Sequence, residues 1–350
     1  MSALPTITPR WNDQPANTPW PTHEWPEAPR RADLEAVIEE GFADGSLGET
    51  NAVLVVQAGR IVAERYGGTT PSFTGDGAPV DAATPLISWS MAKSFLHAAV
   101  GLLVEEGRLD PSAPAPVAEW RDDDRRAITL ANLLAMRDGL DFLESYEVGR
   151  DSDVIEMLFG AGKADMGAFA AARPLAHAPG TVFNYSSGTT NIVSRLLADA
   201  VGRHEDYHRF LTERLFRPIG ATSARATMDE SGVFVASSFL HATARDFARF
   251  GLLYLRGGRW DGSQILAPEW VATAQVPHSH DPETGFYYAW QWWVTGDEFA
   301  SYEAHGYEGQ LISVVPALDA VLVRLGRTPE DNAALVHEWR TRLLAALAAG

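Results

Sequence analysis

Hydrophobic residues recur along the chain at two different spacings, which predict where its helices and strands lie. Apolar residues three and four positions apart predict amphipathic helices, whereas short apolar runs bounded by turn residues predict strands. Residues 31–43 are the first stretch with helical spacing. Residues 53–57 and 61–66 are apolar runs on either side of an Ala-Gly pair, so they predict a β-hairpin.

A block of helices separates these first strands from others near the end of the chain. Residues 90–106 form a strongly apolar helical pattern, which Gly107 ends. Further helices are predicted at residues 130–136, 154–159, 190–201, 206–215, 244–255 and 331–347. Late strands are predicted at residues 287–294, 310–315 and 320–325.

This order of elements predicts an α+β fold, in which helices flank one antiparallel sheet and a mostly helical subdomain is inserted. We expect residues 31–115 and 235–350 to build an α/β subdomain from both chain ends. Residues 116–234 would form the helical subdomain, with the active site between the two. Residues 1–30 are rich in proline, which excludes regular helix, so we expect an extended arm on the body.

The composition excludes several classes of function. The formal net charge of -18 repels nucleic-acid phosphates and anionic lipids, so neither nucleic acid nor membrane is an expected partner. The chain has no cysteine, which removes disulfides, thiolate metal sites and cysteine nucleophiles together. We find no bilayer-spanning apolar run and no secretory signal, so we expect a cytoplasmic protein. The oligomeric state stays open.

The most informative stretch is Ser90-Met91-Ala92-Lys93, at the start of the long apolar helix. Residues three apart share one face of a helix, so Ser90 and Lys93 are expected to face each other. The start of a helix also offers unpaired backbone N–H groups that can hold an oxyanion. Burial among apolar residues lowers the pKa of a lysine, and its neutral amine can then accept the serine proton.

The rarity of lysine strengthens this interpretation. The chain has two lysines, Lys93 and Lys163, against 26 arginines. Arginine does not release its proton in proteins, whereas lysine can, so a lysine inside an apolar helix indicates proton transfer. The alternative is structural: Ser90 caps the helix and Lys93 extends its charged end to solvent.

Two other segments carry residues that could complete such a site. Tyr185 lies in the polar loop Phe183-Asn184-Tyr185-Ser186-Ser187-Gly188 and could share the serine proton with the lysine. In Ala304-His305-Gly306-Tyr307, glycine permits a close backbone approach, and the N–H of Tyr307 could complete an oxyanion hole with that of Ser90. Taken alone, the first segment could be a packed tyrosine beside helix-capping serines, and the second a tight turn.

In this order and at these separations, the three segments resemble the serine β-lactamase and penicillin-binding-protein superfamily. Within it they look most like the esterase and 6-aminohexanoate-oligomer hydrolase branch, over residues 35–348. The resemblance implies a serine β-lactamase-like fold and an acyl-enzyme on Ser90, with Lys93 and Tyr185 as the other catalytic residues. The expected oxyanion- and substrate-binding residues are Tyr307, Gly306, His305, Tyr146 and Ser187.

Two departures from the family pattern affect the expected substrate. Ser187 stands where β-lactamases carry asparagine, and Ala304-His305-Gly306 replaces Lys-Thr-Gly, so the lysine that binds a lactam carboxylate is missing. We therefore expect a small-molecule carboxylic ester as substrate, with linear amides as a further candidate and poor cleavage of penicillins. One face of the aromatic stretch 286–293 is expected to pack in the core of the sheet, which is the favoured interpretation, and the other face could line an apolar pocket. No cofactor or metal is expected, and whether Lys93 or Tyr185 is the formal base stays open.

Two alternatives belong to other classes. His204-Glu205-Asp206-Tyr207-His208 matches a pattern of zinc-dependent hydrolases, in which two histidines four apart bind the metal beside a glutamate, and Glu230 could be a third ligand. Gly202 argues against this, since it would end the previous helix and leave the motif in an exposed first turn. The other alternative is a non-catalytic binding protein of the same fold, which the intact serine, lysine and tyrosine disfavour.

Overall fold

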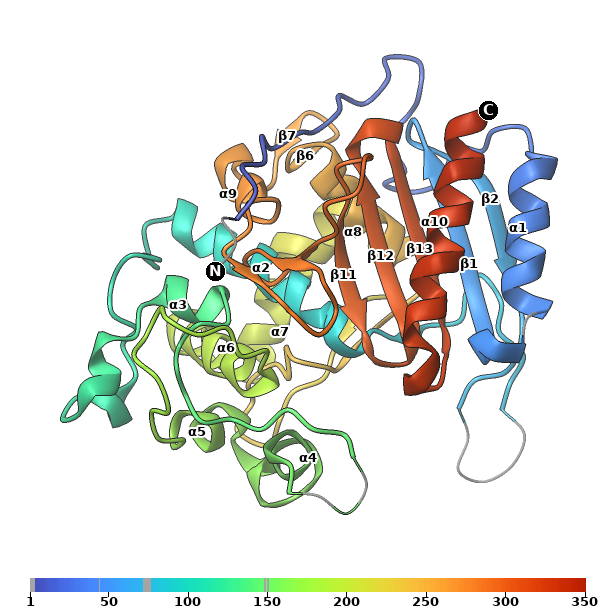
Figure 1. Cartoon of the computed structure of the whole chain (residues 1–350). Coiled ribbons are helices and arrows are strands. Elements are labelled where there is room, and N and C mark those ends of the chain that lie inside the picture. The colour runs from blue at the N-terminus through green and yellow to red at the C-terminus, as the bar shows by residue number, and fades with distance from the viewer. Residues whose placement is uncertain (1–3, 44, 72–76, 148, 150) are drawn as a thin grey trace.

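The centre of the molecule is an eight-stranded antiparallel sheet with the strand order β2-β1-β13-β12-β11-β10-β9-β8 (Figure 1). The computed structural model describes residues 4–43, 45–71, 77–147, 149 and 151–350. In spatial order the strands are β2 (Arg60–Tyr66), β1 (Glu49–Gln57), β13 (Ala320–Arg327), β12 (Gln310–Val315), β11 (Tyr302–Gly306), β10 (Trp293–Val294), β9 (Tyr287–Tyr288) and β8 (Ser279–His280). The first and last long strands, β1 and β13, are therefore direct neighbours.

Helices cover both faces of this sheet (Figure 1). On one face lie α1 (Ala32–Ala43) and α10 (Ala333–Ala349), and their residues Ile38 and Trp339 belong to the same buried cluster as Val55 of β1. On the other face α8 (Ala244–Leu255) packs directly against the sheet. The approach is so close that a Cβ on Gly251 would lie 2.6 Å from Val321. The apolar helix α2 (Ala92–Glu105) packs behind α8 through stacked Phe95 and Phe250 rings, 3.6 Å apart.

The remaining elements lie largely beside the sheet, and most of them are short (Figure 1). The helices are α3 (Leu130–Leu134), α4 (Asp153–Phe159), α5 (Met166–Ala171), α6 (Ser187–Val201), α7 (Glu205–Leu211) and α9 (Pro268–Thr273). The small strands are β3 (Leu86–Ile87), β4 (Arg225–Ala226), β5 (Leu240–Ala242), β6 (Arg259–Trp260) and β7 (Ser263–Gln264). The predicted α+β class is confirmed, while the subdomain boundaries at residues 116 and 234 stay a prediction.

One predicted strand is wrong. Residues 287–294 form two short antiparallel strands, β9 and β10, because the chain reverses at Gln291, which has a left-handed φ of 56°. The buried Gln291 side chain stabilises this turn by accepting from the Thr190 hydroxyl at 2.9 Å and donating to the Leu134 carbonyl at 3.1 Å. Hydrophobic alternation cannot reveal such polar anchoring. Strand β11 was not predicted at all.

The N-terminal segment follows the body of the protein from its first described residues onward. The backbone N–H of Asn12 donates to the Leu255 carbonyl at 2.8 Å, and Trp25 is 7% exposed. Glu27 pairs with Ile61 at the outer strand of the sheet. Residues 1–3 of the predicted arm lie outside the described residues. Within the described part of the chain, no helix is long and apolar enough to cross a membrane.

Candidate active site

Ser90 lies at a sharp entry into helix α2. A short 3-10 turn, Trp89–Met91, precedes the helix, so the helix itself begins two residues later than predicted. Trp89 adopts a left-handed φ of 43°, which is strained for a residue with a Cβ. Pairing of β3 with β5 fixes the approach, since the Ser88 N–H donates to the Leu240 carbonyl at 2.8 Å. Ser90 remains partly exposed.

Lys93, one helical turn later, is 2% exposed and has three hydrogen-bond partners. Its Nζ lies 3.0 Å from Ser90 Oγ, 3.1 Å from Ser187 Oγ and 3.0 Å from the Ser237 carbonyl oxygen. The carbonyl can only accept, so one Lys93 N–H is committed to Ser237. The Ser187 hydroxyl donates its own proton to Glu144, so it also accepts from Lys93. The third position on the nitrogen therefore faces Ser90.

The proton affinity of Lys93 is tuned by its surroundings. Burial lowers the pKa of Lys93 to about 8, and the negative charge of Glu144 partly opposes that effect. A measurable fraction of the amine is then neutral near pH 7. When one proton leaves, the two committed N–H groups stay with Ser237 and Ser187, and the free lone pair points at Ser90 Oγ. The arrangement can thus take a proton from Ser90.

Tyr185 completes the group from the loop before α6. Lys93 Nζ lies 4.8 Å from the centre of the Tyr185 ring, which stacks on Trp293 with centroids 5.4 Å apart. Burial raises the pKa of Tyr185 above its usual range; a hydrogen bond to Ser90 opposes this and the Glu144 charge adds to it. Tyr185 is therefore a neutral phenol at pH 7, able to donate a proton.

Glu144 is a residue that the sequence analysis missed. Its carboxylate accepts from the Ser187 N–H at 2.8 Å, from the Ser187 hydroxyl at 2.6 Å and from the Tyr146 hydroxyl at 2.9 Å. It also raises the pKa values of Lys93 and Tyr185, as described above. Glu144 lies in an irregular acidic loop, where no periodic pattern indicates which side chains face the site. Its closeness in sequence to Tyr146 was the one feature that could have pointed to it.

The strand β11 brings the third predicted segment against the nucleophile. A Cβ on Gly306 would lie 2.3 Å from the Ser88 carbonyl oxygen, so this contact requires glycine. The next residue, Tyr307, packs edge-on against Trp89 with centroids 5.8 Å apart. Trp89 Nε1 also donates to the Glu308 carboxylate at 3.1 Å. Gly306 and Tyr307 are thereby held beside the segment that carries Ser90.

Aromatic rings surround this group on the side that solvent can reach. Tyr146 stacks on Tyr307 at 5.2 Å, and Phe239 lies 6.0 Å from Trp89 and 6.1 Å from Phe159. Tyr307 is 38% exposed and Phe159 57% exposed. The predicted pocket-lining role of the aromatic stretch 286–293 needs correction for Trp290 and Trp292. Trp292 is fully buried in the core, and Trp290 packs against Trp270, because the turn at Gln291 reverses the strand.

His305 has a different environment from that of Tyr307. Its Nε2 lies 2.7 Å from the Glu303 carboxylate, and its ring stacks on Trp293 at 5.6 Å. The role of His305 in substrate binding stays a prediction. In the zinc motif, α7 begins at Glu205, so His204 precedes the helix, and its φ of 52° is not helical.

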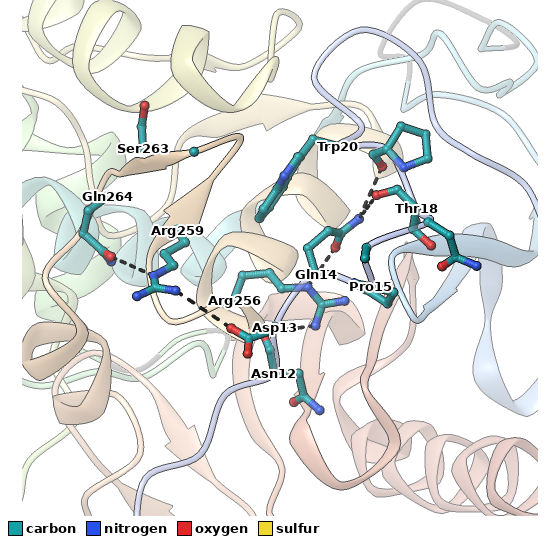
Figure 2. Close-up of a pocket in the computed structure, with 14 residues that line it drawn as sticks. Asn12, Asp13, Gln14, Pro15, Thr18, Trp20, Arg256, Arg259, Ser263 and Gln264 are labelled. Carbon is teal, nitrogen blue, oxygen red and sulfur yellow. Dashed lines mark hydrogen bonds and ion pairs between the residues drawn. The ribbon is translucent and has the colours of Figure 1, made fainter.

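A large surface groove lies elsewhere, under the N-terminal arm (Figure 2). It has a volume of about 1090 Å³ and is lined by residues 12–20 of the arm and by Arg256, Arg259 and Gln264. Arg256 Nε donates to Gln14 at 2.9 Å and also pairs with Asp319, so its charge serves to fasten the arm. The groove holds none of the candidate catalytic residues. This groove is therefore not a candidate active site, although it is large.

The family assignment agrees with this geometry. A family model described as Beta-lactamase matches residues 38–347. The chain belongs to this family, and it is a hydrolase of the serine β-lactamase superfamily. The resemblance found in the sequence is thus confirmed.

Individual relatives add detail. The chain is 29% identical over 338 residues to the 6-aminohexanoate-dimer hydrolase of Paenarthrobacter ureafaciens, covering 91% of this chain and 81% of that protein. A solved Bacillus anthracis structure with the provisional name 6-aminohexanoate-dimer hydrolase is 23% identical, with a TM-score of 0.77 and coverage of 96% of this chain and 89% of its own. A family VIII carboxylesterase is 16% identical, with a TM-score of 0.70 and coverage of 91% and 99%. The two structures support the fold.

Proposed function

We propose that this protein is a serine hydrolase that cleaves carboxylic esters and linear amides through an acyl-enzyme on Ser90. The observation that carries the proposal is the 3.0 Å contact between Ser90 Oγ and Lys93 Nζ, in which the other two hydrogen-bond positions of the amine are already committed. A buried amine with a pKa of about 8 is suited to general-base catalysis near neutral pH. The family assignment supports the same class of reaction.

The reaction would begin with proton transfer from Ser90 to neutral Lys93. Ser90 Oγ attacks the carbonyl carbon, and the developing oxyanion is held by the backbone N–H groups of Ser90 and Tyr307. Tyr185 donates its proton to the leaving oxygen or nitrogen, and is reprotonated through Lys93. Water then attacks the acyl-enzyme, gives a proton to the same network, and releases the acid with Ser90 restored. In this scheme Lys93 is the base and Tyr185 the acid.

Two relatives define the proposed range of substrates. One is named for hydrolysis of a 6-aminohexanoate dimer, which is a linear amide, and another for carboxylic esters. Esters should react faster, because an alkoxide leaves with less help from a general acid than an amine does. The exposed ring of Phe159 and its neighbour Phe239 favour an apolar acyl or alcohol portion. β-Lactams should react poorly, because Ala304 offers no cation for their carboxylate.

A substrate panel tests this order. We expect p-nitrophenyl acetate and butyrate to be hydrolysed with the highest kcat/KM, a linear aminohexanoate dimer more slowly, and nitrocefin least. A higher kcat/KM for nitrocefin than for both esters would contradict the argument from the missing lysine.

The nucleophile is tested by covalent labelling. A fluorophosphonate probe followed by peptide mass mapping should place the label on Ser90, and Ser90→Ala should lose both labelling and turnover. Ser112→Ala, which alters an exposed serine outside the candidate catalytic group, is the matched control and should keep both labelling and turnover. Label on another residue, or full turnover by Ser90→Ala, would rule out the proposed mechanism.

A further inference from the structure

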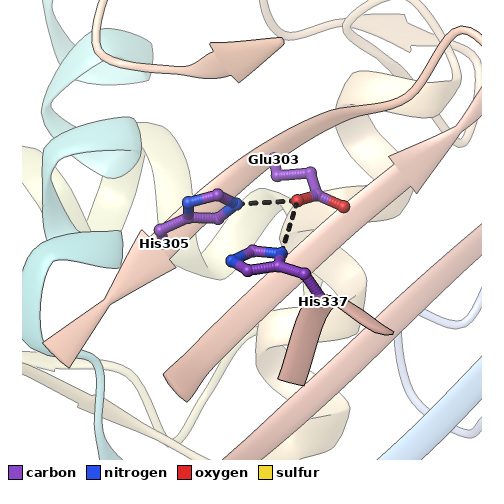
Figure 3. Close-up of side chains that lie close together, drawn as sticks. All are labelled: Glu303, His305 and His337. Atoms are coloured by element: carbon purple, nitrogen blue, oxygen red, sulfur yellow. Dashed lines mark hydrogen bonds and ion pairs between the residues drawn. The ribbon is translucent and has the colours of Figure 1, made fainter. Parts of the chain in front are cut away.

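A cluster of metal-binding side chains lies between the sheet and α10, outside the proposed catalytic group (Figure 3). Glu303 and His305 are two residues apart on β11, so their side chains point to the same face of the sheet. His337 comes from α10, which covers that face. One ligand atom from each residue lies within 4.8 Å of the other two. Among the described residues, no other group of three His, Asp or Glu side chains has its ligand atoms this close together.

One oxygen of the Glu303 carboxylate is already bound by other side chains, and the other faces the two histidines. Glu303 is fully buried, and its Oε1 lies 2.7 Å from Arg340 Nε and 2.6 Å from the Ser313 hydroxyl. Arg340 also pairs with Asp297 at 2.7 Å, so two carboxylates share one guanidinium and one negative charge is left over. The other oxygen, Oε2, faces His305 Nε2 at 2.7 Å and His337 Nδ1 at 4.0 Å.

Two imidazole nitrogens and one carboxylate oxygen are the ligands that zinc and neighbouring transition metals prefer, whereas calcium and magnesium prefer oxygen alone. A tetrahedral ion with bonds of about 2.0–2.2 Å needs ligand atoms about 3.3 Å apart. The 2.7 Å separation must widen and the 4.0 Å separation must shrink, each by less than about 1 Å. The separation between the two histidine nitrogens is no more than 4.8 Å and must shrink by up to about 1.5 Å. The His337 side chain is 32% exposed, so an ion can reach the site from solvent.

We propose that Glu303, His305 and His337 form a binding site for one divalent transition metal ion of the zinc type. The ion replaces the hydrogen bond between His305 and Glu303 and fastens α10 to β11. It is separate from the proposed hydrolytic step, which needs no metal. This departs from the sequence-based expectation of no metal, and it uses other residues than the His204–His208 motif.

Calorimetric titration of the metal-free protein with zinc chloride tests the site. We expect about one equivalent to bind, and His337→Gln to weaken binding about tenfold or more. His337 is the residue of choice because it lies at the edge of the cluster. His305 stacks on Trp293 beside Tyr185, and Glu303 is buried in an ion pair, so changes there would disturb other functions. His208→Gln is the matched control and should bind zinc as tightly as the unchanged protein.

A second measurement keeps the result independent of activity and folding. Cobalt bound at the site should give visible absorption bands of a tetrahedral complex in the unchanged protein and in His208→Gln, and lose them in His337→Gln. Circular dichroism should show the same fold in all three. Absence of binding to the unchanged protein, equal affinity in His337→Gln, or loss of binding in His208→Gln would each overturn the proposal.

Discussion

Glu144 holds Ser187 at two points, accepting one hydrogen bond from its backbone N–H at 2.8 Å and one from its hydroxyl at 2.6 Å. This fixes the direction of the protons, because a hydroxyl that donates to Glu144 must accept from Lys93. The lysine is thereby oriented by a carboxylate that touches neither it nor the nucleophile. Three of the predictions below concern this network and the strand beside it.

Glu144→Gln should shift the pH dependence of hydrolysis to lower pH. The Glu144 charge raises the pKa of Lys93, so its removal makes the amine easier to deprotonate. In the unchanged protein kcat/KM should rise with pH through about 8, where Lys93 becomes neutral. A pH–rate profile measures both midpoints. Glu230→Gln removes an exposed charge elsewhere and should leave the profile in place; equal midpoints in both variants would refute the role of Glu144.

Lys93→Met should abolish turnover without destabilising the fold. The pKa of Lys93 is about 8 in the folded protein against 10.5 in the unfolded one, so the unfolded chain binds this proton more tightly. Burial of the ammonium thus costs up to about 3 kcal/mol below pH 8, and the cost disappears above pH 10.5. Methionine avoids it but loses three hydrogen bonds. We expect a thermal midpoint at pH 7 equal to or above that of the unchanged protein.

A lower thermal midpoint of Lys93→Met would contradict this prediction. A Lys93→Met midpoint several degrees lower at pH 7, or a loss of folding, would show that the three hydrogen bonds outweigh the burial of charge. At about pH 10, where the penalty is mostly gone, the unchanged protein should gain stability relative to Lys93→Met.

Gly306→Ala should reduce kcat about 10²–10³-fold, the effect of losing one oxyanion donor. The added methyl group would meet the Ser88 carbonyl at 2.3 Å and push β11 and Tyr307 away from Ser90. Gly45→Ala is the matched control, because nothing lies within 4 Å of its new methyl group. Steady-state kinetics of both variants tests this, and an unchanged kcat for Gly306→Ala would mean that the strand is not part of the catalytic site.

Removal of metal should leave hydrolysis intact. Ser90, Lys93 and Tyr185 complete the proposed mechanism, and an ion at Glu303 would lie outside it. We expect kcat/KM to be the same before and after treatment with a chelator, with metal content checked by mass spectrometry. Activity that is lost with the metal and also lost in His208→Gln would instead favour the zinc-dependent alternative.

The sequence predicted elements best where local signals were complete. Helix α8 and strand β12 occupy the predicted residues 244–255 and 310–315, because each combines a clear apolar period with a definite start. For α8, the Thr243 hydroxyl caps the helix by accepting from the Asp246 N–H at 3.2 Å. The chemistry of Ser90 and Lys93 was readable for a similar reason, since the two residues are three positions apart where the chain enters α2.

Features that depend on distant parts of the chain were harder to predict. The turn at Gln291 is set by polar contacts with Thr190 and Leu134, which no periodicity records. Glu144 reaches the site from an irregular loop, 43 positions before Ser187. The cluster of Glu303, His305 and His337 is formed across two elements, so spacing along the sequence does not reveal it.

Because β1 pairs with β13, this part of the sheet cannot form until nearly the whole chain has been synthesised. Glu49 and Arg327 are partners across these strands but are 278 positions apart. At about 5–20 residues per second, β1 leaves the ribosome on the order of tens of seconds before its neighbour is made. Throughout that time the apolar strand has an open edge, which is the surface through which chains aggregate. Until β13 has been made, this open edge of β1 is therefore a place where the nascent chain can misfold or aggregate.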